Sequence, residues 1–104
     1  MPVELIDDSR TLPKKKEALK EPEDYAVILL NDDFTTRDFV VEVLKRVFHL
    51  SGAEATRIML HVHYKGRGVV GYFTWDIANT KVGQVHAFAR EYNYPLRCVV
   101  ESVN

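Results

Sequence analysis

Three polar residues, Asn31-Asp32-Asp33, directly follow the apolar run Val27–Leu30. A strand that ends in short hydrogen-bonding side chains holds them at one fixed place on the edge of a hydrophobic core. Asn31 has an amide, Asp32 has a carboxylate, and His63, if neutral, offers a further acceptor. Acceptors around an apolar hole suit an ammonium group attached to a hydrophobic side chain, such as the α-amino end of a peptide.

The Asn-Asp-Asp run also has a purely structural interpretation, because these residue types favour turns and helix caps. A third interpretation uses Asp32 and Asp33 as a catalytic acid and base. Adjacent side chains at the end of a strand point apart, which argues against a shared proton. A structural turn and the rim of a binding pocket both remain open on these residues alone.

Other residues that could perform chemistry have weak sequence settings. Ser51 lacks the G-x-S-x-G context of a nucleophilic serine and is better explained as a helix cap. His61 and His63 are two positions apart, which is not the helical spacing of metal pairs. Gly66 and Gly68 mark a connecting turn and not a phosphate-binding loop. We therefore predict no enzyme, no cofactor and no zinc site, although the chain contains His49, His61, His63 and His86.

The elements that position these residues are predicted from hydrophobic periodicity and capping patterns. Capping boxes are expected at Thr35 with Asp38 and at Ser51 with Glu54. Within the second helix His63 lies beside the apolar stripe, whereas His61 lies on the other side and should face water. The predicted order is a strand over 23–31, a helix from 35 to about 51, a helix over 52–64, a strand over 69–73, a helix from 74 to about 93, and a strand over 96–103.

Three strands cannot cover themselves on both faces, so the helices should pack on one face in a two-layer α+β fold. The chain has 104 residues, of which 46% are hydrophobic and 28% charged, and a net charge of −1. These values give no electrostatic case for nucleic acid or a membrane surface. Cys98 is the only cysteine, which excludes an internal disulfide. Without an apolar leader or a long apolar run, the protein is expected in the cytoplasm.

Composition divides the chain into two parts. Residues 1–22 are rich in charge and poor in large apolar side chains, which predicts a flexible charged extension. Residues 23–104 then form a single folded core domain.

Four stretches resemble one known family, the ClpS adaptors of the bacterial Clp protease. They are VILLNDDFTTRDFV, MLHVHYKGRGVVGYFT, TKV and YPLRCVVE, and the similarity runs from about Tyr25 to Glu101. The resemblance implies a β-α-α-β-α-β sandwich related to the C-terminal domain of the ribosomal stalk protein. In that fold a three-stranded antiparallel sheet is covered by three helices on one face.

The resemblance also implies a function and the residues that perform it. ClpS proteins bind N-degrons, whose first residue is Leu, Phe, Tyr or Trp, and deliver them to the AAA+ unfoldase ClpA or ClpC for degradation by ClpP. By matching positions, Asn31, Asp32 and His63 would bind the α-amino group. The N-domain of the unfoldase would dock on Asp76, Asn79 and Lys81, and the charged extension would serve handover. The side-chain pocket would be lined by Leu29, Thr35, Arg37, Val40, Met59, Val62 and Leu96.

Arg37 departs from the family, in which many members have Met at the mouth of the pocket. This arginine either swings away and widens the mouth or lays its stem across it. We expect a monomeric adaptor that changes which substrates the protease degrades. The alternatives are a stalk-like docking module that does not bind N-termini, or a small hydrolase. If His63 accepts from the ammonium, binding should weaken as the pH falls toward about 6, where unperturbed histidines protonate.

Overall fold

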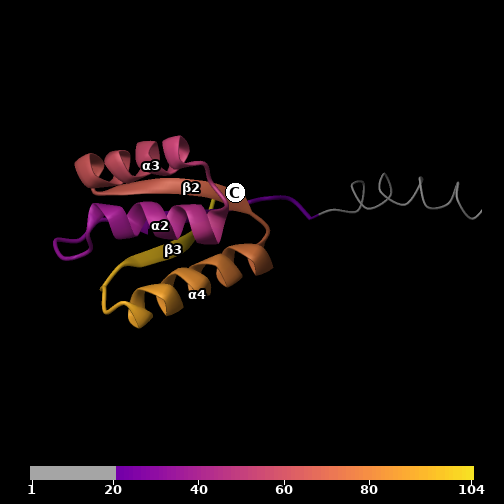
Figure 1. Cartoon of the computed structure of the whole chain (residues 1–104). Helices are drawn as coiled ribbons and strands as arrows, with labels where there is room; N and C mark the ends of the chain where they lie inside the picture. Colours follow the sequence, from indigo (N-terminus) through magenta and orange to yellow (C-terminus); the bar gives the residue numbers. More distant parts are fainter. Residues whose placement is uncertain (1–20) are drawn as a thin grey trace, which may run out of the picture.

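The computed structural model describes residues 21–104, so the extension predicted for residues 1–22 lies outside the described residues except for its last two. The described chain folds as three strands and three helices in the predicted order, which confirms the two-layer α+β fold (Figure 1). The elements are β1 (Tyr25–Leu30), α2 (Arg37–Phe48), α3 (Gly52–Lys65), β2 (Arg67–Phe73), α4 (Trp75–Glu91) and β3 (Arg97–Ser102).

The sheet has the order β2-β1-β3, and both pairings are antiparallel. Alternation along β1 directs Val27 and Leu29 into the core that the helices cover, as expected for a strand whose side chains alternate between faces. Leu29 pairs with Cys98 on β3 and with Gly68 on β2. Because β1 is central, the segment that follows it emerges between both neighbouring strands.

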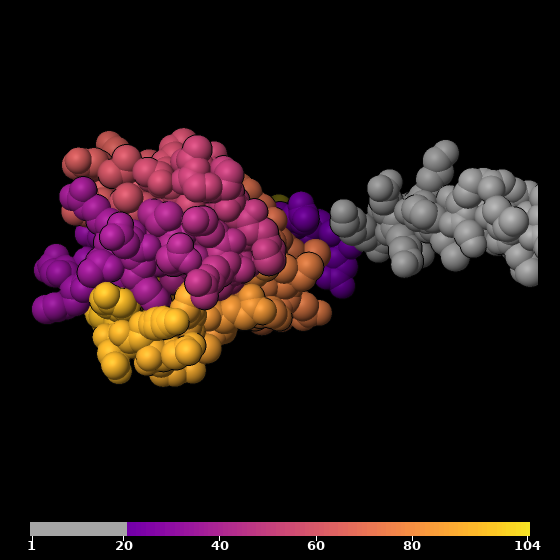
Figure 2. Space-filling model, in the orientation of Figure 1, coloured from indigo at the N-terminus to yellow at the C-terminus, as the bar shows by residue number. Residues whose placement is uncertain are grey.

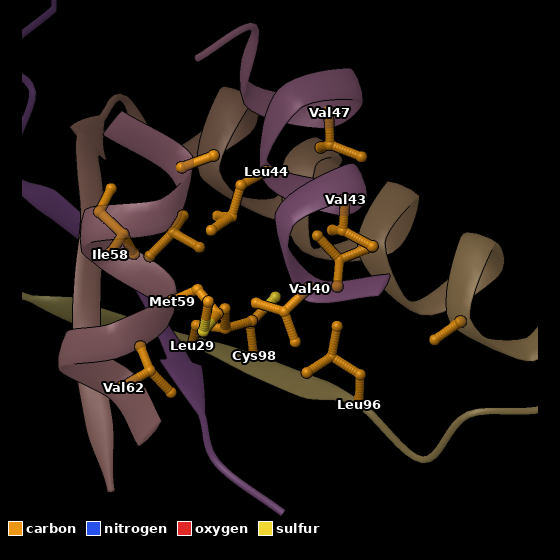
Figure 3. Close-up of a cluster of buried hydrophobic side chains, with 14 of the residues drawn as sticks. Leu29, Val40, Val43, Leu44, Val47, Ile58, Met59, Val62, Leu96 and Cys98 are labelled. Atoms are coloured by element: carbon orange, nitrogen blue, oxygen red, sulfur yellow. The ribbon is translucent and has the colours of Figure 1, made fainter. Parts of the chain in front are cut away.

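The three helices lie on one face of the sheet, with α2 between α3 and α4 (Figures 1 and 2). In the close-up of the core, Met59 and Val62 of α3 and Val40 of α2 lie around Leu29 of the central strand (Figure 3). All four of these side chains are buried. These side chains form the part of the core that lies beside the end of β1, and the same core continues along α2, α3 and α4.

The start of α2 corrects one sequence prediction. Thr36, and not Thr35, is the N-cap residue, and its hydroxyl accepts a hydrogen bond from the Phe39 backbone N–H at 3.2 Å. The Thr35 hydroxyl and backbone N–H both donate to Asp32, which directs that side chain at the carboxylate and leaves the next residue to cap the helix. The helix accordingly begins two residues later than predicted. It also ends at Phe48, before residue 51, because His49 adopts a left-handed conformation with a φ of 58°.

The prediction for α3 is confirmed at its N-terminus, where the Ser51 hydroxyl accepts from the Glu54 backbone N–H at 3.1 Å. The reciprocal half of the predicted capping box is replaced by an ion pair, because the Glu54 carboxylate binds Arg57. Gly66 ends the helix with a φ of 91°, a conformation that glycine adopts without steric cost. This single glycine is the whole connection to β2, which begins two residues earlier than predicted.

Candidate functional site

A pocket of about 340 Å³ opens at the end of β1, between the start of α2 and the end of α3. Its deeper wall is apolar, and its rim is formed by the polar segment from β1 to α2 together with one histidine of α3. This volume lies at the lower end of ordinary ligand pockets, which suits a group the size of one amino acid. The lining residues are Leu29, Leu30, Asn31, Asp32, Asp33, Phe34, Thr35, Thr36, Arg37, Val40, Met59, Val62, His63 and Leu96.

The pocket brings together all ten residues that the sequence analysis assigned to amino-group binding and to the side-chain pocket. They come from β1, the segment after it, α2, α3 and the residue before β3, so only tertiary packing makes them neighbours. The prediction omitted Leu30, Asp33, Phe34 and Thr36. Their position inside the continuous 29–37 segment was the available signal, because a segment that curves around a cavity exposes most of its residues to it.

Asp32 organises the rim through three hydrogen bonds to its own loop. Oδ1 accepts from the backbone N–H groups of Phe34 and Thr35 at 2.8 and 2.7 Å, and Oδ2 accepts from the Thr35 hydroxyl at 2.7 Å. A carboxylate has about four acceptor positions, so about one remains, on Oδ2, for a ligand. Burial acts to raise the pKa of Asp32, but the bonds from Thr35 and Phe34 together lower it. The group is therefore ionised at neutral pH.

Asn31 is held beside Asp32 by its main chain. Its backbone N–H donates to the carbonyl of Gly66 at 2.9 Å, which ties the end of β1 to the end of α3. Its side chain is exposed at the rim and remains available to a ligand. The glycine that ends α3 thus also sets the distance between the Asn31 side of the rim and the helix that carries His63.

His63 lies at the edge of the pocket, near the C-terminal end of α3. Its Nε2 is 2.9 Å from Nη2 of Arg37, which reaches it from the first turn of α2. A guanidinium has no acceptor, so the histidine nitrogen accepts in this contact. His61 is exposed and does not line the pocket, and its ring packs near Gly68 of β2. The predicted difference between the two histidines is confirmed.

The three residues assigned to unfoldase binding lie in the first two turns of α4, away from the pocket. Asp76 and Asn79 are exposed, and the Asn79 side chain donates to the Trp75 carbonyl at 2.8 Å. Lys81 is half-buried because its ammonium donates to the carbonyl of Val47 at 2.6 Å, near the end of α2. All three lie near the N-terminal end of α4. Lys81 also donates to the Val47 carbonyl, which belongs to the last turn of α2 and so has no partner within that helix.

Other reactive groups of the described chain are used for packing. Burial raises the pKa of the Cys98 thiol to about 12, so it is not a nucleophile at neutral pH. Among residues 21–104 no three His, Cys, Asp or Glu side chains gather as a metal site would require. Within the same residues no helix has the length and apolar character needed to cross a bilayer.

The fold and the pocket define a small α+β domain with an apolar cavity of about 340 Å³ and hydrogen-bond acceptors at its mouth. A sequence model of the family described as "ATP-dependent Clp protease adaptor protein ClpS" matches residues 20–99. The ClpS adapter protein of Syntrophus aciditrophicus is 54% identical over 88 residues, which cover 85% of this chain and 82% of the relative. The ClpS of Acetivibrio thermocellus is 54% identical over 94 residues, covering 88% and 95%.

The fold is also similar to a solved structure, that of Agrobacterium tumefaciens ClpS2 bound to L-phenylalaninamide. The two share 40% sequence identity and superpose with a TM-score of 0.75, covering 79% of this chain and 99% of that one. The present chain belongs to the ClpS family of adaptors of the ATP-dependent Clp protease. Its partners are therefore components and substrates of that protease.

Proposed function

We propose that this protein binds the free N-terminal residue of N-degron substrates, when that residue is Leu, Phe, Tyr or Trp. It then delivers them to the unfoldase ClpA or ClpC for degradation by ClpP, and so modulates which proteins the protease degrades. The observation that carries this proposal is the Asp32 carboxylate. It is ionised, fixed by three hydrogen bonds, and retains about one acceptor position at the mouth of an apolar pocket.

The α-amino group is the part of the ligand that Asn31, Asp32 and His63 bind. An ammonium has three N–H donors, and these three side chains carry one acceptor each at the rim, that of His63 once Arg37 leaves Nε2. Each well-formed bond to a charged group contributes about 1.5–3 kcal/mol. An acetylated N-terminus is neutral and has a single N–H, so it cannot satisfy the three acceptors.

The side chain of the first residue enters the cavity over Leu29, Met59 and Val62. Burying a Leu or Phe side chain there contributes roughly 1.5–3 kcal/mol. Association and ordering costs offset much of the total, which leaves affinity of about micromolar or somewhat tighter. Such affinity permits release, which delivery requires. A protein with this role binds without chemistry, so we propose no catalytic residue, metal or cofactor.

Delivery requires a second surface, and we propose that Asp76, Asn79 and Lys81 dock on the N-domain of the unfoldase. These three residues differ in how much of the fold a substitution would disturb. Replacing Lys81 would also remove the hydrogen bond to the Val47 carbonyl, whereas the Asp76 side chain is exposed. Asp76→Asn is therefore the cleaner substitution for detecting loss of docking while peptide binding is retained.

The remaining parts of the proposal concern organisation and location. Residues 23–104 are the adaptor core, and residues 1–22 are a charged extension used for handover and not for recognition. We further propose that the protein acts as a monomer in the cytoplasm, and that it binds neither nucleic acid nor membranes. The net charge of −1 supports this last point, because such partners require a strongly basic surface.

The test is fluorescence-anisotropy binding of a short peptide that begins with Leu or Phe, beside its N-acetylated twin. We expect the free-amine peptide to bind at about micromolar concentration and the acetylated peptide to bind at least tenfold more weakly. Equal binding of the two twins, or no binding of either, would contradict amine recognition. That result would favour a docking module, and cleavage of the peptide by the pure protein would favour a hydrolase.

A further inference from the structure

Arg37 stands at the mouth of the pocket with an unusual set of partners. Its guanidinium binds the ring of His63 at 2.9 Å, and no carboxylate of residues 21–104 forms an ion pair with it. The side chain is exposed and lines the pocket. A guanidinium has five N–H donors and matches a carboxylate in a two-point contact, so residues 21–104 use only a small part of its hydrogen-bonding capacity.

The contact with His63 also occupies an acceptor that the ligand needs. Because the guanidinium only donates, Nε2 accepts and the ring proton of a neutral His63 resides on Nδ1. An incoming ammonium likewise only donates. It can bind this histidine only if Arg37 leaves Nε2 or the ring exchanges its proton between nitrogens. Ligand binding and the Arg37–His63 contact therefore compete.

A guanidinium displaced from His63 remains at the mouth of the pocket, because Arg37 lines that mouth from the first turn of α2. The first side chain fills the cavity and its amino group sits at the rim, so the second residue is the next group at the opening, beside Arg37. Asp32 and Asp33 are the carboxylates of the loop opposite, and Asp38 follows Arg37 on α2. Three of the about four acceptor positions of Asp32 are already bonded, and among residues 21–104 neither Asp33 nor Asp38 forms an ion pair with Arg37.

We infer that Arg37 binds the side chain of the second residue of the ligand and favours an acidic side chain at that position. A Glu or Asp carboxylate there would replace the contact that Arg37 loses at His63. This inference rests on the proposed function, since it requires a peptide whose first residue occupies the pocket. It makes Arg37 a specificity-determining residue outside the cavity, with a carboxylate as the group that it recognises.

The experiment compares two peptides that begin Leu-Glu and Leu-Gln and are otherwise identical, using the full chain. Glu and Gln have nearly the same shape, so a difference in affinity reports charge. At about 50 mM salt we expect the Leu-Glu peptide to bind about two- to fivefold tighter, as for a solvent-exposed ion pair. The preference should shrink at about 500 mM salt, because screening weakens it.

Arg37→Met is the matched variant, because Met keeps an unbranched apolar stem and removes the guanidinium. We expect it to lose the preference for Leu-Glu and to bind Leu-Gln about two- to threefold tighter than the wild type, since Nε2 is then free. Arg37→Lys should keep part of the preference. In the ligand-free wild type, ¹⁵N NMR of neutral His63 should show the proton on Nδ1, and Arg37→Met should lower that population.

Two results would overturn the inference while leaving the proposed function intact. One is equal binding of Leu-Glu and Leu-Gln by the wild type, with the acetylated twin still excluded. The other is a preference that persists in Arg37→Met, which would assign it to another charge of the rim. Failure of every free-amine peptide to bind would instead contradict the proposed function itself, and the inference with it.

Discussion

His63 on α3 and His86 on α4 both accept or share a hydrogen bond with another element, and the two histidines differ in what they bind. His63 on α3 is exposed at the pocket and contacts the guanidinium of Arg37, a long and flexible side chain. His86 on α4 is half-buried, and its Nε2 accepts from the backbone N–H of Cys98 in β3 at 3.1 Å. The first partner can leave, whereas the second is part of the sheet.

The two histidines also differ in their electrostatic surroundings. Burial lowers the pKa of His86, and the nearby charges of Arg97 and Arg90 lower it further. Its ring is thus neutral and acts as a fixed acceptor for the sheet. A histidine bonded to backbone stabilises the fold, whereas a histidine bonded to a mobile cation at a pocket is available to a ligand. The following predictions test this contrast.

The largest expected effect is on peptide binding at the edge of the pocket that α3 forms. His63→Ala should weaken binding of a free-amine Leu peptide by about 10- to 100-fold, because one bond to the ammonium is lost, with little change in the melting temperature. His61→Ala is the matched control, since His61 is exposed on the same helix and outside the pocket. Equal losses in the two variants, measured by anisotropy, would remove His63 from the site.

Asp32→Ala should also weaken binding, but it is a less specific variant. Its carboxylate accepts three hydrogen bonds from within the loop before α2, so its removal loosens the loop as well as the ligand site. We expect this variant to lose about 1–3 kcal/mol of unfolding free energy in addition, measured by urea denaturation. Unchanged stability would mean that the loop does not depend on these bonds.

Replacing Gly68, beside α3, or Gly83, within α4, with alanine should change the unfolding free energy in opposite directions. A Cβ added at Gly68 would lie 2.9 Å from both the Val62 side chain and the His61 ring, so Gly68→Ala should destabilise the fold by about 1–3 kcal/mol. At Gly83, inside α4, nothing lies within 4 Å. Gly83→Ala should therefore raise the unfolding free energy by up to about 1 kcal/mol, because alanine favours a helix. Thermal melts of both variants, compared with the wild type, would measure the two changes in stability.

His86→Ala should lower stability without changing peptide affinity, the reverse of His63→Ala. Removing the ring leaves the Cys98 N–H without its acceptor, at a cost of about 1–3 kcal/mol where it stays shielded from water. His86→Gln supplies an amide oxygen and should recover part of the loss. A drop in peptide affinity in His86→Ala, at a temperature where it remains folded, would contradict a purely structural role.

The smallest expected effect is the pH dependence that His86 contributes. Its pKa is lowered in the folded state, so the unfolded chain binds more protons and the stabilisation is present above the ordinary histidine pKa of about 6.5. The unfolding free energy should therefore fall as the pH is lowered from about 7.5 to 5.5. Denaturation at both pH values should show a smaller fall in His86→Gln, and an equal fall would assign the dependence to other groups.

Much of this architecture follows from local sequence. Alternating or helical apolar spacing determined the type and order of all six elements of the described chain, because each buries one regular face. Ser51 marked the start of α3 correctly, since its cap uses only neighbouring residues. The start of α2 was predicted wrongly because Asp32, three residues away, engages Thr35 and leaves the cap to Thr36.

The residue types around Asn31 indicated what the site binds, whereas only the tertiary structure decided how they meet. Packing of α3 against β2 and α2 brings His63 to the same opening as Asp32. Periodicity placed His63 beside the apolar stripe, but it could not show that Arg37, 26 residues earlier, reaches the ring. Contacts between exposed side chains of different elements leave no periodic trace in the sequence, because they depend on how helices cross over a sheet.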